Sequence, residues 1–334
     1  MSPGKWAEPA VERTAPVVEP GRARPAGVGD KAAPMSPAIH TVELRKHFRR
    51  TVALQGLSMT VARGEVFGFL GPNGAGKTTA VKLLLGLVRP TSGQAMVLGA
   101  PAGDRETRRH IGYLPELFRF QSWLTAREAL TLHCKLLQLP RQRWPDAVAE
   151  ALQIVGLSGR GDDRIGAFSK GMQQRLGLGA ALLGEPALIV LDEPTSALDP
   201  VGRHQVRAII RDLRARGATV FLNTHLLEEA EQVCDRVTVI DKGRSVATGT
   251  IGELVGRESR VRLKVTGLEE DWWRPLRAFG RWVANGDWLL VEGIAAERVP
   301  ELVTTIVSLG GQVAAVVPEY QSLETRFLEL LGET

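Results

Sequence analysis

The stretch VFGFLGPNGAGKTT, residues 66–79, constrains this chain more than any other part of it. An apolar strand from Val66 to Leu70 leads into a glycine-rich turn, and an apolar periodicity predicts a helix over residues 80–87. The turn has the phosphate-loop spacing G-x-x-x-x-G-K-[ST]. Its glycines let the backbone wrap around phosphates with the N–H groups pointing inward, and the helix N-terminus adds a favourable dipole. Because the strand-to-helix context disfavours an ordinary glycine-rich turn, this stretch predicts a nucleotide site.

The side chains of the loop have chemical roles of their own. Lys77 is placed to reach the β- and γ-phosphates, and the Thr78 hydroxyl is placed to ligate Mg²⁺. The predicted phosphate-binding residues are Gly71, Pro72, Asn73, Gly74, Ala75, Gly76, Lys77, Thr78 and Thr79.

Composition excludes several classes of protein. The chain has 334 residues, enough for one large or two modest domains, and its 44% hydrophobic and 24% charged content is that of an ordinary soluble globular protein. The net charge of +5 is modest and spread along the chain, so nucleic-acid binding is not expected, although a basic surface would also suit an anionic membrane face. Cys134 and Cys234 form no C-x-x-C pair, which indicates a reducing compartment. We find neither a secretory signal nor an apolar run long enough to cross a bilayer.

The pattern divides the chain into three segments. Residues 1–37 are rich in proline and glycine, which predicts a disordered extension, with a docking tail as the alternative. Residues 38–255 alternate strands and helices and predict an α/β domain with a mainly parallel sheet and a helical insertion at about 116–170. Residues 256–334 follow the order βαββαβ plus a helix, which predicts a small α+β accessory domain for docking or dimerisation.

Two carboxylates follow a second apolar strand. The continuous apolar run Ala187 to Leu191 is typical of a strand buried on both faces, and Asp192 and Glu193 come directly after it. Ligands bind at this end of a parallel sheet. We therefore expect Asp192 to hold Mg²⁺ through water and Glu193 to polarise an attacking water. The alternative is a surface turn before Pro194.

Residues 38–255 resemble the nucleotide-binding subunit of an ATP-binding cassette (ABC) transporter. GPNGAGKTT resembles the family's Walker A motif, and ALIVLDEP resembles Walker B. Between them, FSKGMQQR at 168–175 resembles the signature usually written LSGGQ, SALD at 196–199 resembles the D-loop, and His225 resembles the switch histidine. Phe48 lies where the family places an aromatic ring that stacks on adenine.

The signature also has a physical interpretation. Ser169 is a good N-cap and Gly171 leaves the helix start uncovered, so free N–H groups and a positive dipole end would face an anion. The resemblance implies that Ser169, Gly171 and Asp199 contact the ATP held by the phosphate loop of a second copy or of a homologous ATPase. It further implies ATP and Mg²⁺ as cofactors, catalytic roles for Glu193, His225 and Lys77, and a separate integral membrane permease, with the chain peripheral on the cytoplasmic side of the inner membrane.

The chain departs from the family pattern at two places. Lys170 and Met172 depart from the signature, and Glu116 stands where the family usually has a glutamine. A carboxylate at 116 would approach Mg²⁺, so the predicted metal-binding set is Thr78, Asp192 and Glu116. Both variants, and the closing segment 322–330, resemble an export-type subfamily, so export is expected rather than import.

Two rival functions stay open. One is a soluble non-transport ABC ATPase of the translation or DNA-repair type, but the chain shows neither a second cassette nor a long coiled coil. The other is a nucleotide-gated regulatory scaffold that does not hydrolyse ATP. Intact Asp192, Glu193 and His225 argue against the scaffold.

Overall fold

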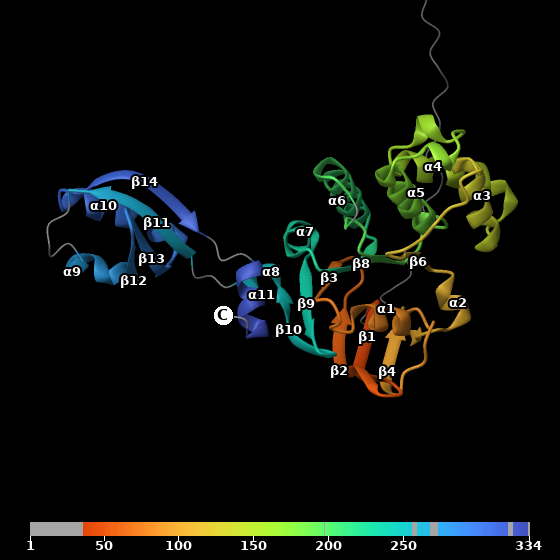
Figure 1. Cartoon of the computed structure of the whole chain (residues 1–334), viewed down its shortest axis with the longest axis horizontal. Coiled ribbons are helices and arrows are strands. Elements are labelled where there is room, and N and C mark those ends of the chain that lie inside the picture. Colours follow the sequence, from red (N-terminus) through yellow and green to blue (C-terminus); the bar gives the residue numbers. More distant parts are fainter. Residues whose placement is uncertain (1–35, 197, 256–258, 268–272, 320–322, 333–334) are drawn as a thin grey trace, which may run out of the picture. The chain divides into compact units, whose positions relative to one another are not determined.

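The computed structural model describes residues 36–196, 198–255, 259–267, 273–319 and 323–332, which are coloured by sequence in Figure 1. Almost all of the extension predicted for 1–37 lies outside these residues. Among the described helices, none combines the length and the apolar character that a bilayer crossing needs.

A six-stranded sheet forms the centre of the nucleotide-binding part, in the order β10-β9-β3-β8-β7-β6. The strands β9, β3, β8, β7 and β6 run parallel, and β10 is antiparallel to β9. The mainly parallel sheet predicted from the sequence is therefore confirmed. Its strands are β3 (Val66–Leu70), β6 (Ile111–Leu114), β7 (Leu188–Asp192), β8 (Thr219–Thr224), β9 (Arg236–Asp241) and β10 (Arg244–Thr250).

Aromatic packing anchors the middle of this sheet. Every residue of β3 and β7 is buried, as expected for strands covered on both faces. Phe221 on β8 lies between two rings of β3, with centroids 6.1 Å from Phe67 and 5.4 Å from Phe69. This packing holds the ends of β3 and β8 in register, which matters because the nucleotide loop begins where β3 ends.

A separate antiparallel sheet precedes and follows the phosphate loop in sequence, in the order β2-β1-β4-β5. Its strands are β1 (Ile39–Phe48), β2 (Thr51–Val61), β4 (Ser92–Val97) and β5 (Ala100–Pro101). Its buried residues share a hydrophobic core with β3 and with α1, the helix after the phosphate loop. This sheet therefore flanks the loop, an arrangement that the strand pattern alone did not specify.

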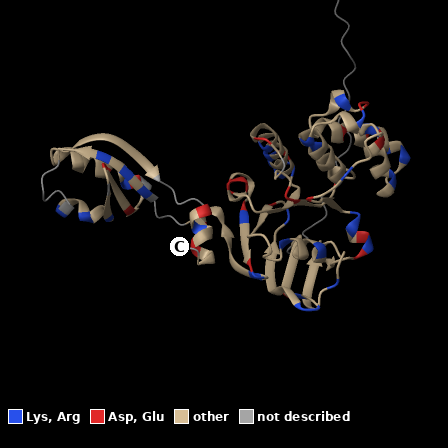
Figure 2. Cartoon of the chain, viewed as in Figure 1, with Lys and Arg blue, Asp and Glu red and all other residues tan. Residues whose placement is uncertain are grey.

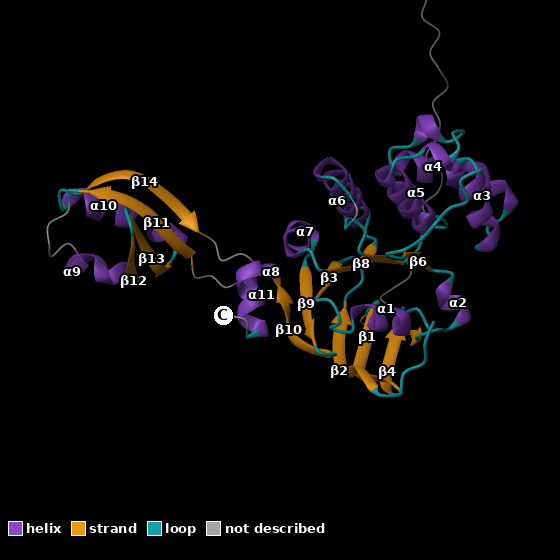
Figure 3. Ribbon diagram, viewed as in Figure 1, coloured by secondary structure: helices purple, strands orange, loops and turns teal. Residues whose placement is uncertain are grey.

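Eight α-helices of the described residues accompany these sheets, and Figure 3 shows α3, α4 and α5 gathered into a group of their own. Buried side chains from all three, including Leu130, Leu152 and Leu176, share one core. A capping box opens α3, with Thr125 and Glu128 each accepting the other's backbone N–H. The helices are α1 (Lys77–Leu84), α2 (Arg105–Arg108), α3 (Ala126–Leu136), α4 (Trp144–Ile154), α5 (Lys170–Leu182), α6 (Pro200–Ala215), α7 (Leu227–Val233) and α8 (Ile251–Val255).

The first helix differs from the sequence prediction, which placed it at 80–87. It begins at Lys77, because Gly76 closes the loop with a left-handed φ of 105° and the chain enters helical conformation at the next residue. It ends at Leu84, two residues before Gly86, whose φ is 66°. Lys77 and Thr78 therefore lie in the first helical turn.

The C-terminal segment contains β11 (Ser259–Thr266), α9 (Trp273–Leu276), β12 (Arg281–Asn285), β13 (Trp288–Ile294), α10 (Val299–Ser308), β14 (Gln312–Glu319) and α11 (Leu323–Leu331). Its antiparallel sheet has the order β12-β13-β11-β14 and its own core, which includes Leu263, Val291 and Leu302. The sequence analysis assigned the last helix, α11, to this small domain, but its buried contacts lie elsewhere. Leu323 of α11 is fully buried in a cluster with Leu70 and Ala230, so α11 packs on the nucleotide-binding part beside α7 and α8.

A buried ion pair joins the helices that follow two predicted nucleotide loops. Nη1 of Arg207 on α6 lies 3.0 Å from Oε1 of Glu229 on α7, and the two side chains are only 15% and 6% exposed. Asp199 is the N-cap of α6, and α7 begins two residues after His225. The pair therefore connects the D-loop-like segment to the histidine segment through α6 and α7.

Replacing Arg207 by alanine should lower the free energy of unfolding by about 3 to 5 kcal/mol, because Glu229 would remain buried without a partner. Urea denaturation measures this loss. The matched control is Arg127→Ala, which removes an exposed pair with Asp162 and should change stability little. Equal effects from the two substitutions would show that the buried pair carries no special share of the stability.

Candidate nucleotide site

A pocket of about 430 Å³ opens at the carboxyl ends of β3, β7 and β8 and collects most of the predicted site. Twelve predicted residues line it: Phe48, Pro72, Asn73, Gly74, Gly76, Lys77, Thr78, Thr79, Glu116, Asp192, Glu193 and His225. A larger cavity, of about 550 Å³, lies between α4, the end of α5 and the end of α6, and no predicted site residue lines it.

The loop backbone explains why glycine is needed at two positions. A Cβ on Gly76 would lie 2.4 Å from the carbonyl oxygen of Ala53, and a Cβ on Gly71 would lie 2.3 Å from that of Ile240. Both approaches are far below any real contact distance, so neither position accepts a side chain. Gly71 and Ala75 are buried behind the pocket, where they shape the loop.

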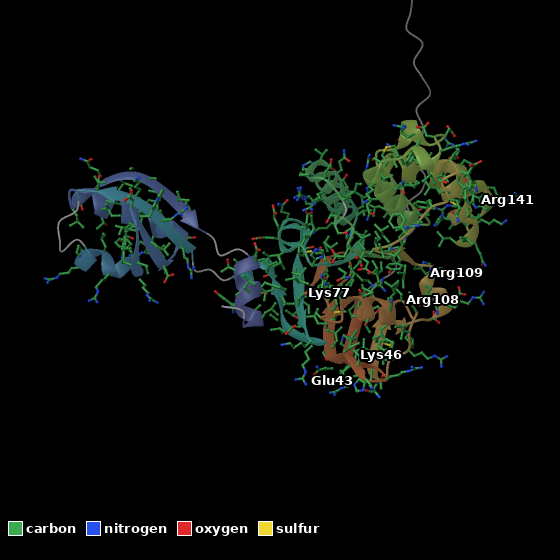
Figure 4. The ribbon with its side chains drawn as sticks, in the orientation of Figure 1. Glu43, Lys46, Lys77, Arg108, Arg109 and Arg141 are labelled. Atoms are coloured by element: carbon green, nitrogen blue, oxygen red, sulfur yellow. The ribbon has the colours of Figure 1, made fainter. Side chains whose placement is uncertain are left out.

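Lys77 lies at the bottom of the pocket with its ammonium group directed at the loop, and Figure 4 labels it. Its Nζ donates to the carbonyl oxygens of Gly71, at 2.7 Å, and Pro72, at 3.2 Å. Burial lowers the pKa of Lys77, and the negative charges of Glu193, Asp192 and Glu116 oppose that shift. The lysine therefore supplies positive charge where three carboxylates converge.

Glu193 is held by two neighbours from β8 and the residue after it. Its Oε1 lies 2.7 Å from Nδ1 of His225, and Oε2 accepts from the Thr224 hydroxyl at 3.3 Å. The backbone N–H of Glu193 donates to the Asn223 carbonyl at 2.9 Å. Glu193 has a left-handed φ of 50°, a strained conformation for a residue with a side chain. The backbone conformation of Glu193 and its contacts with Thr224 and His225 together hold its nearly buried carboxylate in the pocket.

Asp192 lies deeper, with only 2% of its surface exposed. Nδ2 of Asn223 donates to its Oδ1 at 2.5 Å. Burial raises the pKa of Asp192, and burial together with the nearby Asp192 charge raises the pKa of Tyr113 to about 12. The pocket thus presents two carboxylates, the buried Asp192 and the exposed Glu116, beside the hydroxyl group of Thr78.

The expected adenine-stacking residue lies at the mouth of this pocket. Phe48 ends β1 and is 44% exposed, so its ring is free to receive a planar ligand. Nζ of Lys46 lies 4.7 Å from the ring centroid, which adds a cation over the aromatic ring.

Besides Gly71 and Ala75, which lie behind the pocket, three predicted residues do not enter the pocket of their own chain: Ser169, Gly171 and Asp199. Ser169 is the N-cap of α5 and accepts from the Met172 N–H at 3.2 Å, as the sequence predicted for a cap. A Cβ on Gly171 would meet nothing closer than 3.7 Å, so the start of α5 is uncovered. Asp199 caps α6. Ala197 of the D-loop-like segment lies outside the described residues.

Five pocket or near-pocket residues escaped the sequence analysis: Thr51, Val52, Ala53, Tyr113 and Asn223. Asn223 carried a signal, because it ends a strand of the parallel sheet beside the strand of Asp192. Thr51 to Ala53 begin β2, and no sequence signal marked them as site residues, because only the antiparallel sheet brings them to the loop.

Comparison with known proteins decides the family. The ABC transporter family profile matches residues 54–196. An ABC transporter ATP-binding protein of Nostoc sp. is 39% identical over 305 residues, which cover 87% of this chain and 88% of that protein. The chain belongs to the ABC transporter ATP-binding proteins. Members of this family hydrolyse ATP to power transport, so this ABC protein is an ATPase.

Two further similarities bear on the ABC protein. The Nod factor export ATP-binding protein I of Rhizobium sp. is 40% identical over 220 residues, 65% of this chain and 72% of that protein. A solved structure described as a dimeric post-hydrolysis state of an ATP-binding cassette, bound to ADP and phosphate, aligns with a TM-score of 0.58 at 23% identity and covers 64% of this chain and 99% of that chain. The second likeness confirms the fold.

Proposed function

We propose that this chain is the ATPase subunit of an exporter, bound to the cytoplasmic side of the inner membrane through a separately encoded permease. The export direction is supported by the relative named for Nod factor export and by the Glu116 and signature variants. ATP binding closes a pair of chains, and hydrolysis reopens them, which moves the helical insertion against the permease.

The observation that carries this proposal is the split of the site. Lys77, Glu193 and His225 share one pocket, whereas Ser169 and Gly171 form an uncovered helix start outside it. Free N–H groups at a helix start bind anionic oxygens. A second copy would bring its α5 start over the γ-phosphate, so each nucleotide lies between two chains. A solved structure of the same fold is described as dimeric and bound to ADP and phosphate, which supports a pairing of two chains.

Within each half, the residues divide the chemistry. Lys77 binds phosphate oxygens, and the Phe48 ring stacks on the base. Glu193 accepts a proton from the attacking water, while His225 fixes the Glu193 carboxylate through its Nδ1 contact. Product release follows when the α5 start of the partner withdraws.

The donor set of the pocket fits Mg²⁺. Thr78, Asp192 and Glu116 offer the hard oxygen ligands that this ion prefers. Among the described residues, no group of three or more histidine, cysteine or acidic side chains forms a cage that would hold a metal alone. That pattern suits an ion that takes its other ligands from phosphates and water. When bound, Mg²⁺ neutralises charge that develops on the phosphates.

The segment after Glu116 offers a surface for the permease. Leu117 is 87% exposed and Trp123 is 69% exposed, and both lie between the glutamate of the pocket and α3. Large apolar side chains this exposed mark protein contact sites. A permease helix on these residues would sense the nucleotide through Glu116.

Co-purification with the membrane protein encoded beside this gene tests the proposal. The wild-type chain should bind that permease and release phosphate from Mg-ATP. The double variant Leu117→Ser and Trp123→Ser should lose the permease and keep its basal phosphate release, while the control Val307→Ser, an exposed valine on α10, keeps both. Association of the wild-type chain with ribosomes or DNA would contradict the proposal. Full retention of the permease by the Leu117→Ser, Trp123→Ser double variant would contradict it as well.

A further inference from the structure

The region from Asp104 to Arg143 has a local excess of positive charge. It holds eight arginine and lysine residues against four acidic ones. Figure 2 shows basic segments, in blue, on α2 and on the helical insertion. A local excess of this size creates a positive field over one part of the surface.

The four acidic residues of this region are engaged locally. Asp104 caps α2 through the Thr107 N–H, and Glu128 belongs to the capping box of α3. Glu116 lines the nucleotide pocket, and Glu106 pairs with Arg109 at 3.3 Å. Arg127 and Arg143 also pair with acids outside this region, Asp162 and Glu185. The positive charge that no ion pair engages among the described residues includes that of Arg105, Lys135 and Arg141.

Two leucines are exposed on the outer side of α3. Leu132 is 42% exposed and Leu136 is 69% exposed, and their i,i+4 spacing places them on one stripe with Lys135 between them. The opposite side of the helix buries Ala129, Leu130 and Cys134. The exposed leucines are therefore surplus to the core of the helical insertion.

A hydrogen bond places Arg109 next to this stripe. Nη2 of Arg109, at the end of α2, donates to Oε1 of Gln138 at 2.9 Å, two residues after Leu136. Arg141 follows in the 3₁₀ turn after α3, and Figure 4 shows it with Arg108 and Arg109 along one outer edge. We call the resulting patch the α2–α3 surface; it comprises Arg105, Arg109, Leu132, Lys135, Leu136 and Arg141.

We propose that the α2–α3 surface rests directly on anionic phospholipid, with Leu132 and Leu136 at the boundary of headgroups and acyl chains. Arginine and lysine beside exposed leucines form the amphipathic pattern of membrane-surface helices. Neither Arg105 nor Lys135 has an ion-pair partner among the described residues, so both are available to lipid phosphates. This second membrane contact deepens the proposed function, since it would orient the ATPase under its permease.

A lipid layer fits this surface better than an acidic protein segment. The basic groups stand on three different elements, and Arg105, Lys135 and Arg141 are all exposed residues, with Cζ of Arg141 5.5 Å from the centroid of the Trp144 ring. A fluid layer of headgroups adapts to such scattered charges, whereas a folded partner needs fixed counter-charges at each position.

Sedimentation with protein-free vesicles tests whether the basic residues of the α2–α3 surface bind anionic lipid. The full chain should bind phosphatidylcholine vesicles that contain phosphatidylglycerol, bind pure phosphatidylcholine weakly, and lose binding as salt rises. Arg105→Gln and Arg141→Gln should each weaken binding about fivefold, and the control Lys242→Gln, whose side chain is 86% exposed on the β9–β10 turn, should not. Equal binding to both vesicle types, or unchanged binding of both arginine variants, would overturn the proposal.

A double variant tests the role of the two exposed leucines. It also separates the lipid proposal from the exporter proposal. Leu132→Ser with Leu136→Ser should lose most vesicle binding while basal phosphate release stays normal, and Val307→Ser should behave as wild type. No permease is present in the vesicle experiment, so a lack of vesicle binding would leave the exporter proposal intact. Loss of permease binding with Leu117→Ser would likewise leave the lipid proposal intact. Permease loss in Arg105→Gln or Arg141→Gln with normal vesicle binding would assign the surface to a protein and overturn the lipid proposal.

Discussion

Replacing Glu193 by glutamine should slow phosphate release about 10² to 10⁴-fold while ATP still binds. The amide keeps the shape of the side chain but no longer accepts a proton from water. The expectation rests on how this carboxylate is held: His225 lies 2.7 Å from one oxygen, the Thr224 hydroxyl 3.3 Å from the other, and the residue is almost buried at a strained φ.

Single-turnover phosphate release and ATP affinity, measured on the same preparation, separate catalysis from binding. Glu228→Gln is the matched control, because Glu228 is an exposed carboxylate on α7, outside the pocket. Turnover of Glu193→Gln close to the wild-type value would remove Glu193 from the catalytic role.

Replacing Lys77 by alanine should weaken ATP binding about 10 to 100-fold, the loss expected for a hydrogen bond to a charged group in a buried site. Lys77 is only 7% exposed, and its charge interacts with those of Asp192, Glu193 and Glu116. Without it the three carboxylates would face phosphate charge uncompensated. The variant should therefore fail at binding, unlike Glu193→Gln, which should fail at turnover.

Titration calorimetry measures that affinity directly. Lys82→Ala serves as the control, because Lys82 is exposed on the same helix and lies outside the pocket. If Lys77→Ala binds ATP as the wild-type chain does, the loop does not hold phosphates in the way described above.

Local motifs explain why so much was predictable. The phosphate loop, its strand and the Asp192–Glu193 pair are short contiguous patterns whose spacing already dictates their geometry. The parallel sheet followed from the alternation of strands and helices and from the apolar runs of β3 and β7. The family comparison confirms the ATPase assignment that these patterns supported.

Contacts between distant segments explain what was not predicted. The side of the pocket at Thr51 to Ala53 comes from an antiparallel sheet that no local pattern orders, and the Arg207–Glu229 pair depends on how two helices pack. The packing of α11 on the nucleotide-binding part depends on contacts of Leu323 with a cluster that contains Leu70 and Ala230, which are distant from it in the sequence. Such pairings are set by tertiary packing, which sequence periodicity does not encode.

The two-chain nucleotide site is tested most directly by the mass in solution of Glu193→Gln, measured by light scattering with and without Mg-ATP. Two copies should associate when Mg-ATP is added and separate when it is removed, and adding Ser169→Ala to the same chain should reduce that association. A chain that keeps the mass of one copy at saturating Mg-ATP, or pairs equally well without Ser169, would contradict a site completed by the partner.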